Sequence, residues 1–271
     1  MTKSRRVATR HGEIAVYESE GQGPALLLIH GNSSSAAIFH YQLSGEIGQQ
    51  YRVIALDLPG HGDSSDAPDP EATYSIEGYA DAISDLLAIL DIQDAVILGW
   101  SLGGHIGLEL ISRYPSLRGL LITGTPPVAK DELSLGFKSN PDVVLAGKAH
   151  LSPHEVRIFA RSTSGEPCSE ELVRAVARTD GRARRLMFEK FAAGSGANQK
   201  EIVARATIPI AVINGRDEPF VNLDFLARVK FNHLWRQQTF TIAGAGHAPF
   251  REQPEIFNRY LQEFISEINQ K

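Results

Sequence analysis

Short apolar runs alternate with stretches of helical periodicity along most of the chain. The runs predict strands buried on both faces, and they lie at 25–29, 52–56, 95–98, 117–123 and 208–213. Apolar residues at helical spacing predict helices that pack on such strands, over 75–90, 101–114 and 256–265. Because strands and helices alternate, we predict an α/β fold with a largely parallel sheet covered on both sides.

Three further segments complete this pattern. Positions 7–10 and 13–18 alternate partly and flank His11-Gly12, which predicts a β-hairpin at an antiparallel edge. We also expect a helix over 36–47 and a short strand at 239–242.

The pattern changes between about 126 and 207, where no convincing core strand is visible. Helical stretches follow one another at 153–161, 169–178 and 182–192, with Pro, Gly and Asn at the breaks. We therefore predict an α/β core formed by 1–125 and 208–271, with an inserted helical cap (lid) at 126–207. The cap's aromatic residues and methionine fit a substrate channel or ordinary cap packing equally well: Phe137, Phe159, Met187, Phe188 and Phe191. Its basic cluster is better explained by a solvated face or ion pairs than by an anion site: Arg182, Arg184, Arg185 and Lys190.

Composition narrows the class of ligand. The chain has 271 residues, 42% of them hydrophobic, and a net charge of -5, which gives no electrostatic reason to expect nucleic acid or an anionic membrane surface. The single cysteine, Cys168, excludes an internal disulfide and fits a reducing compartment. No apolar run is long enough to span a bilayer. We expect a cytoplasmic protein that acts on a small neutral or weakly charged molecule without an obligate protein partner.

The stretch Gly99-Trp100-Ser101-Leu102-Gly103 lies between a predicted buried strand and a predicted helix. A serine on so tight a turn needs small neighbours two residues to either side, and glycine occupies both positions. We therefore predict that Ser101 is a nucleophile, although the five-residue pattern alone is weak evidence.

An acid and a histidine follow the serine in the order expected of a catalytic triad. A serine hydroxyl needs a neutral imidazole to accept its proton, and His247 lies after the predicted strand at 239–242. Asp217 and Glu218 are both candidates for the carboxylate that orients this imidazole. We favour Glu218, because the following Pro219 restricts its backbone to extended conformations.

Other residues near these strand ends are candidates for binding substrate. The backbone N–H groups of Leu102 and Asn32 are the predicted oxyanion donors. The Asn32 side chain fits a substrate contact or a turn contact equally well, and Trp100 fits a cavity wall or simple burial. Gly31 lies in the same loop as Asn32.

The remaining histidines favour structural roles. His30 and His61 lie in loops beside the predicted site, and His105 begins the helix after Ser101. The other histidines form no grouped ligand pattern, so we expect no metal. Gly103-Gly104 does not complete a dinucleotide-binding motif, and we expect no cofactor.

These motifs together resemble the α/β-hydrolase superfamily, and more narrowly its metal-independent N-acyl-homoserine lactone lactonases. The similarity spans most of the chain and includes His30-Gly31-Asn32-Ser33-Ser34-Ser35, 99–105, 123–127, the lid stretch 177–185, 214–220 and 246–250. The resemblance implies a Ser101–His247–Glu218 triad that opens the lactone ring, with the acyl tail under the lid. A carboxylesterase or carbon–carbon bond hydrolase of the same fold is the alternative, and a ligand receptor that retains the fold is a third.

Overall fold

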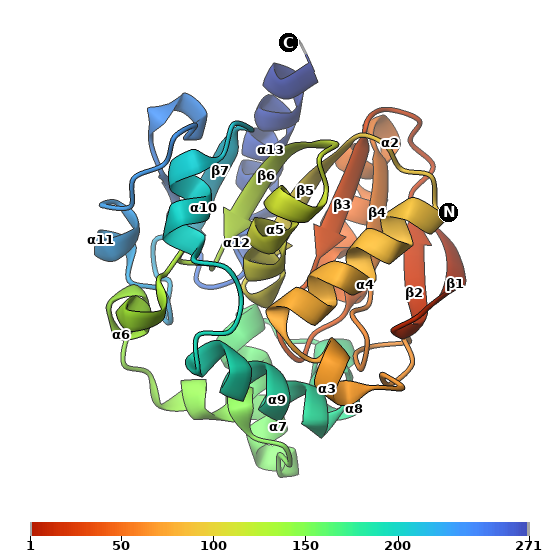
Figure 1. The fold of residues 1–271 in the computed structure, drawn as a ribbon, viewed down its shortest axis with the longest axis vertical. Helices are drawn as coiled ribbons and strands as arrows, with labels where there is room; N and C mark the ends of the chain where they lie inside the picture. The colour runs from red at the N-terminus through yellow and green to blue at the C-terminus, as the bar shows by residue number, and fades with distance from the viewer. Residues whose placement is uncertain (1, 270–271) are drawn as a thin grey trace.

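The computed structural model describes residues 2–269, which form one eight-stranded sheet covered by helices (Figure 1). The strand order is β1-β2-β4-β3-β5-β6-β7-β8. The first two strands form the predicted antiparallel hairpin, β2 pairs antiparallel with β4, and the other pairings are parallel. The bounds are β1 (Lys3–Thr9), β2 (Gly12–Glu18), β3 (Ala25–Ile29), β4 (Arg52–Leu56), β5 (Ala95–Trp100), β6 (Leu117–Thr123), β7 (Ile210–Gly215) and β8 (Phe240–Ile242).

Alternate residues of the central strands enter two separate hydrophobic cores. In β3, Leu27 and Ile29 join one core, whereas Leu26 and Leu28 join the other. The first core is covered by α4 (Ile76–Ile89), α5 (Leu102–Arg113) and α10 (Gln199–Arg205). The second is covered by η1 (Ala36–Phe39), α1 (His40–Ser44), α2 (Glu46–Gln50), α12 (Pro249–Glu252) and α13 (Pro254–Asn269). Shorter elements connect these layers: α3 (Pro70–Thr73), α11 (Leu223–Leu226) and η4 (Trp235–Gln237).

The segment between β6 and β7 is helical in the described chain. It contains η2 (Lys130–Glu132), α6 (Leu133–Gly136), η3 (Pro141–Gly147), α7 (Pro153–Ser164), α8 (Glu170–Arg178) and α9 (Gly181–Ala192), followed by α10. Helices α7 to α9 gather below the core in the view of Figure 1, whereas α6 lies at the left near α11. Part of this segment has its own small core, which includes Leu145, Val156 and Phe159. Its last helix, α10, instead packs beside α5, and Val203 enters the first core.

Helix boundaries follow local capping chemistry. Ser152 and Glu155 form a capping box at the start of α7, and Ser169 caps α8 by accepting a hydrogen bond from the Leu172 backbone. The helical stretch predicted around 36–47 is confirmed, and it is divided into η1, α1 and α2; Gly45 adopts an extended backbone and separates α1 from α2. No helix within residues 2–269 combines the length and apolar character needed to cross a membrane.

Candidate active site

Ser101 occupies the sharp turn between β5 and α5. Its backbone has φ 54° and ψ −117°, a strained conformation for a residue other than glycine. A Cβ atom at Gly99 would lie 2.4 Å from the Gly103 carbonyl oxygen, and one at Gly103 would lie 2.0 Å from the Ile29 carbonyl oxygen. The flanking glycines are therefore required by close backbone packing. The Ser101 N–H donates to the Thr123 carbonyl at 2.9 Å, and this bond helps to hold the turn.

Glu218 and His247 form a buried pair at the ends of β7 and β8. His247 Nδ1 lies 2.9 Å from both carboxylate oxygens of Glu218, and the side chains are 5% and 0% exposed. Burial pushes the pKa of Glu218 upward, but His247 and the Phe220 and Val221 amides outweigh it and hold the pKa below its usual value. Asp217 is exposed, so Glu218 is the acid that the fold directs at the imidazole.

Two further side chains hold the loop that carries His247. Trp100 Nε1 donates to the His247 carbonyl at 2.8 Å. The carboxylate of Glu252 accepts from the Gly246 and Ala248 N–H groups, each at 2.9 Å. Sequence reasoning missed Glu252. Its position near the start of the last helical region carried no signal, because only the folded loop brings both N–H groups to one carboxylate.

A cavity of about 350 Å³ opens between the core and the helical segment. Ser101 and His247 both line it, although no direct hydrogen bond joins their side chains within the described chain; this looser spacing is common in unliganded sites. Trp100 both lines the cavity and is buried, so the two interpretations of this residue are compatible. The facing wall is apolar and includes all five residues of the predicted channel: Phe137, Phe159, Met187, Phe188 and Phe191.

Asn32 and Leu102 lie on the core side of this cavity, together with Gly31. Among residues 2–269, no acceptor is found for the backbone N–H of Asn32 or of Leu102. Free N–H groups beside a nucleophile are suited to stabilise a developing oxyanion. The Asn32 side chain is occupied elsewhere, since Nδ2 donates to the Ala146 carbonyl at 2.8 Å. That contact crosses to η3 and does not close a local turn.

Comparison with known proteins decides the family. The model of the alpha/beta hydrolase family matches residues 26–260. The chain is an α/β-hydrolase.

Relatives of this hydrolase fall into more than one activity class. An uncharacterized protein of Mycobacterium tuberculosis is 37% identical, over 95% of this chain and 80% of that protein. A pimeloyl-[acyl-carrier protein] methyl ester esterase of Xanthomonas oryzae pv. oryzae is 29% identical, over 92% of this chain and 97% of that protein.

Solved structures of N-acyl homoserine lactonase AidH are much more similar. One is a glutamate-to-glycine mutant complexed with N-hexanoyl homoserine; it is 59% identical, with a TM-score of 0.99 over 100% of this chain and 98% of its own. Another is a serine-to-glycine mutant complexed with N-hexanoyl homoserine lactone; it is 60% identical, with a TM-score of 0.98 over 99% of both chains.

Arg184 connects the helical segment of the hydrolase to the Asn32 loop. The prediction of a solvated or ion-paired side chain is wrong for this member of the basic cluster, since Arg184 is 4% exposed and burial lowers the pKa of its guanidinium. It donates to the carbonyl groups of Lys148, Ala149 and Val176 at 2.9, 3.2 and 3.1 Å. Lys148 and Ala149 follow η3 directly, whereas Val176 lies in α8, so Arg184 joins two parts of the helical segment. Its Nη1 also donates to Ser33 Oγ at 3.5 Å and so reaches the Asn32 loop.

The other basic residues of that cluster form ion pairs, as expected. Arg182 pairs with Asp180 at 2.8 Å, Arg185 pairs with Glu189 at 2.9 Å, and Lys190 pairs with Glu71 at 3.2 Å.

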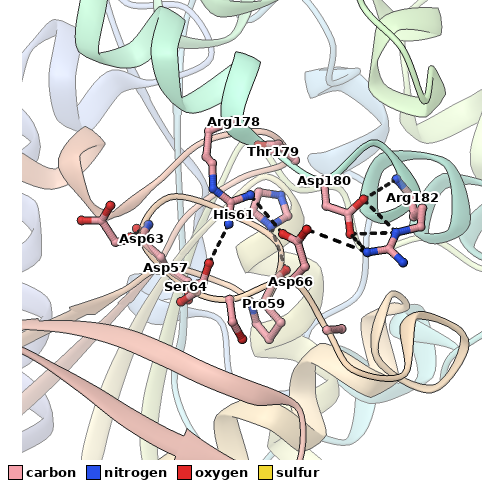
Figure 2. Close-up of polar contacts among 12 residues, drawn as sticks. Asp57, Pro59, His61, Asp63, Ser64, Asp66, Arg178, Thr179, Asp180 and Arg182 are labelled. Atoms are coloured by element: carbon pink, nitrogen blue, oxygen red, sulfur yellow. Dashed lines mark hydrogen bonds and ion pairs between the residues drawn. The ribbon is translucent and has the colours of Figure 1, made fainter.

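A polar cluster fastens the end of α8 and the start of α9 to the loop after β4 (Figure 2). Arg178 donates to the Ser64 carbonyl at 2.8 Å and to the Asp66 carboxylate at 3.0 Å. The Asp180 N–H donates to the Gly60 carbonyl at 2.8 Å. We call these contacts the cap latch.

Two histidines beside the site have structural partners. His30 Nδ1 donates to the Gly31 carbonyl at 2.7 Å, and Nε2 accepts from the Leu58 N–H at 3.0 Å. The ring of His61 packs 5.2 Å from that of His30 and bonds to the Pro59 carbonyl (Figure 2). Within the described part of the chain, no group of three or more His, Cys, Asp and Glu residues is arranged to hold a metal.

Proposed function

We propose that this hydrolase opens the lactone ring of N-acyl-homoserine lactones to give N-acyl-homoserines, as a soluble cytoplasmic enzyme without a cofactor. The observation that carries the proposal is the near-complete superposition on lactonase AidH at 59% identity, including the helical segment over the cavity. The geometry supports it, because a serine, an oriented imidazole and free N–H donors meet an apolar cavity of about 350 Å³. Residues 126–207 act as the cap in this proposal.

The proposed reaction begins with attack of Ser101 Oγ on the lactone carbonyl carbon. His247 Nε2 accepts the serine proton while Glu218 holds Nδ1–H and stabilises the imidazolium that forms. The oxyanion accepts hydrogen bonds from the Asn32 and Leu102 N–H groups, each of which contributes on the order of a hundredfold to a thousandfold in rate. The ring ester bond then breaks, and His247 returns the proton to the departing alkoxide, which becomes the homoserine hydroxyl.

Water completes the cycle. His247 accepts a proton from water as its oxygen attacks the acyl-enzyme carbonyl, and the bond to Ser101 breaks. Ser101 regains a proton, and N-acyl-homoserine leaves as a carboxylate, so each turnover consumes one water and releases one proton. In the alternative route, water attacks the lactone directly and Ser101 only orients it. Trapping of an acyl-Ser101 adduct separates the two routes.

The AidH complexes provide chemical support for this assignment. The serine-to-glycine mutant is complexed with the lactone, and the glutamate-to-glycine mutant with N-hexanoyl homoserine. These substitutions remove the two residue types that flank His247 in the proposed triad here.

The methyl ester esterase among the relatives favours a second candidate function, hydrolysis of simple carboxylic esters by the same triad. The cavity does not distinguish a lactone from an open ester, because both present an ester carbonyl to Ser101.

Product identification by mass spectrometry tests the proposal. Wild-type protein is incubated with a panel of N-acyl-homoserine lactones beside Ser101→Ala. We expect a mass gain of one water, one proton released per turnover, and loss of turnover in the variant. Free homoserine lactone would indicate amide cleavage and overturn the lactonase assignment. Hydrolysis of aryl esters with none of the lactones would establish the esterase.

A further inference from the structure

Within the described chain, the active-site cavity contains one polar side chain that has neither a role in the proposed reaction nor a hydrogen-bond partner for each of its ring or polar atoms. Its polar lining consists of Asn32, Ser101, His105, Thr163 and His247. Ser101, His247 and the Asn32 backbone serve the chemistry, and the Thr163 hydroxyl donates to the Phe159 carbonyl at 2.7 Å. His105 remains.

His105 presents a hydrogen-bond acceptor to this cavity. The residue is 5% exposed and lies among the rings of Phe191 and Phe137, with centroid separations of 4.9 and 6.1 Å. Nδ1 lies 2.8 Å from Gln199 Oε1, an atom that only accepts, so Nδ1 carries the proton. Nε2 is then an acceptor, and no partner for it is found among residues 2–269.

The ring stays neutral under physiological conditions. Burial lowers the pKa of His105 to about 4, and the Gln199 bond only partly opposes this shift. A neutral acceptor on the cavity wall selects for a ligand that carries a donor, because a ligand that covers this nitrogen without a donor leaves it buried and unpaired.

We propose that His105 Nε2 accepts a hydrogen bond from an N–H or O–H donor on the acyl side of the substrate. This makes His105 a specificity-determining residue for the lactonase activity on which the inference rests. Two groups in acyl-homoserine lactones have this chemistry: the amide N–H and a hydroxyl at C3 of the acyl chain.

Helix geometry favours the hydroxyl. Ser101 directly precedes α5 and His105 lies one turn along the helix, a rise of about 6 Å, and both residues line the cavity. The amide nitrogen is only two bonds from the carbonyl carbon that Ser101 attacks. A C3 hydroxyl is several bonds farther along the chain, toward the rings that flank His105.

Two substitutions isolate the acceptor. His105→Asn can keep a donor for Gln199, because the Asn amide reaches about as far as Nδ1, but it removes the acceptor at Nε2. His105→Gln places an amide oxygen near the Nε2 position and is expected to restore the contact. Phe191→Leu is the matched control, since it alters the same wall without changing any acceptor. Thermal unfolding of each variant verifies that it folds.

The readout is kcat/KM on three lactones: N-hexanoyl-homoserine lactone, its 3-hydroxyhexanoyl analogue, and an alkyl γ-lactone that lacks both donors. We expect His105→Asn to lower the hydroxylated-to-unsubstituted ratio about tenfold, the value of one hydrogen bond, and His105→Gln to restore much of it. Phe191→Leu should leave this ratio unchanged.

The arms separate the possible outcomes. If the substrate amide is the donor, His105→Asn lowers kcat/KM equally for both acyl-homoserine lactones relative to the alkyl lactone. His105 Nε2 is then still the acceptor, and its donor is the amide N–H and not the C3 hydroxyl. If the ratios of kcat/KM among the three lactones are the same in His105→Asn as in the wild type, the inference is overturned. Wild-type protein that opens none of the lactones refutes the proposed function instead, and equilibrium binding of the same lactones to Ser101→Ala then still tests His105.

Discussion

The two walls of the cavity are built by different means. On the core side, each polar group is fixed by hydrogen bonds: His247 by Glu218, the His247 loop by Glu252, and Ser101 by its turn. On the helical side, the wall is apolar, and it is attached to the core by Arg184 and by the partly exposed cap latch.

This difference suggests a division of labour. Strand ends of a parallel sheet hold reacting groups rigidly, so the chemistry resides on the core. The aromatic side chains of the facing wall lie on short helices, and in the proposed function they contact the acyl tail. His105 is the exception, because it lies on a core helix yet faces the acyl side.

Replacement of the triad acid should give the largest effect. We expect Glu218→Gln to lower kcat about 10³- to 10⁴-fold, because His247 loses the partner that fixes its tautomer. Asp217→Asn, at the exposed neighbour, should retain activity close to wild type. Steady-state lactone hydrolysis measures both. A larger loss of kcat in Asp217→Asn than in Glu218→Gln would assign the role of triad acid to Asp217 and contradict the assignment of Glu218.

Arg184→Met tests whether the two walls act together. The substitution leaves three carbonyl groups without their donor, which should cost about 2–4 kcal/mol of unfolding free energy. If the hydrogen bond from Asn32 Nδ2 to the Ala146 carbonyl positions the Asn32 loop, kcat should also fall about tenfold, with KM less affected. Arg185→Met, on the same helix but exposed, is the control. Lower stability with an unchanged kcat would show that the oxyanion donors are independent of the cap.

Acid should weaken the core through its buried histidines. Burial lowers the pKa of His30 and of His105 to about 4 and holds that of His61 well below its usual value, whereas all three titrate near 6.5 in the unfolded chain. The unfolded state therefore binds more protons below pH 6.5, so stability is full above that pH and falls as the pH approaches 4.

The expected slope is about 1.4 kcal/mol per pH unit for each of these histidines. Urea unfolding at pH 7.0 and 5.5 should show a loss of about 4 kcal/mol in all. The His105→Asn variant should lose about two-thirds as much over the same interval. Equal stability at the two pH values would mean that these rings accept protons without unfolding.

The cap latch should give the smallest effect. Arg178→Ala removes contacts to Ser64 and Asp66 at a partly exposed site, so we expect a fall in Tm of about 2–4 °C and a KM rise of a few-fold. Arg157→Ala breaks the exposed pair with Glu170 within the cap and should change neither value measurably. Equal effects of the two substitutions would show that the latch contributes nothing beyond a surface ion pair.

The sequence predicted the core better than the cap, for a physical reason. Strands such as 25–29 are continuous apolar runs bounded by turn residues, and β3 has those bounds. The fold class and the α/β-hydrolase family were likewise visible in the strand-end motifs, and the family match confirms them. Ser101 and His247 were recognisable because their loops follow such strands.

Tertiary contacts between distant segments were not predictable in this way. The burial of Arg184, the bracing by Glu252 and the unpaired nitrogen of His105 each depend on groups far apart in sequence or on loop closure. The spacing of residues along the sequence does not indicate which backbone carbonyl groups an arginine side chain contacts in the folded protein. The catalytic roles of Ser101, His247, Glu218, Asn32 and Leu102 stay predictions.

The indole of Trp100 provides an optical consequence of this architecture. It lines the cavity with its ring centroid 5.6 Å from that of His247, while the second tryptophan, Trp235, packs elsewhere beneath the Arg236 guanidinium. Occupation of the cavity therefore changes the surroundings of one fluorophore and leaves the other as a constant background. The protein carries a built-in fluorescent reporter of its own active site.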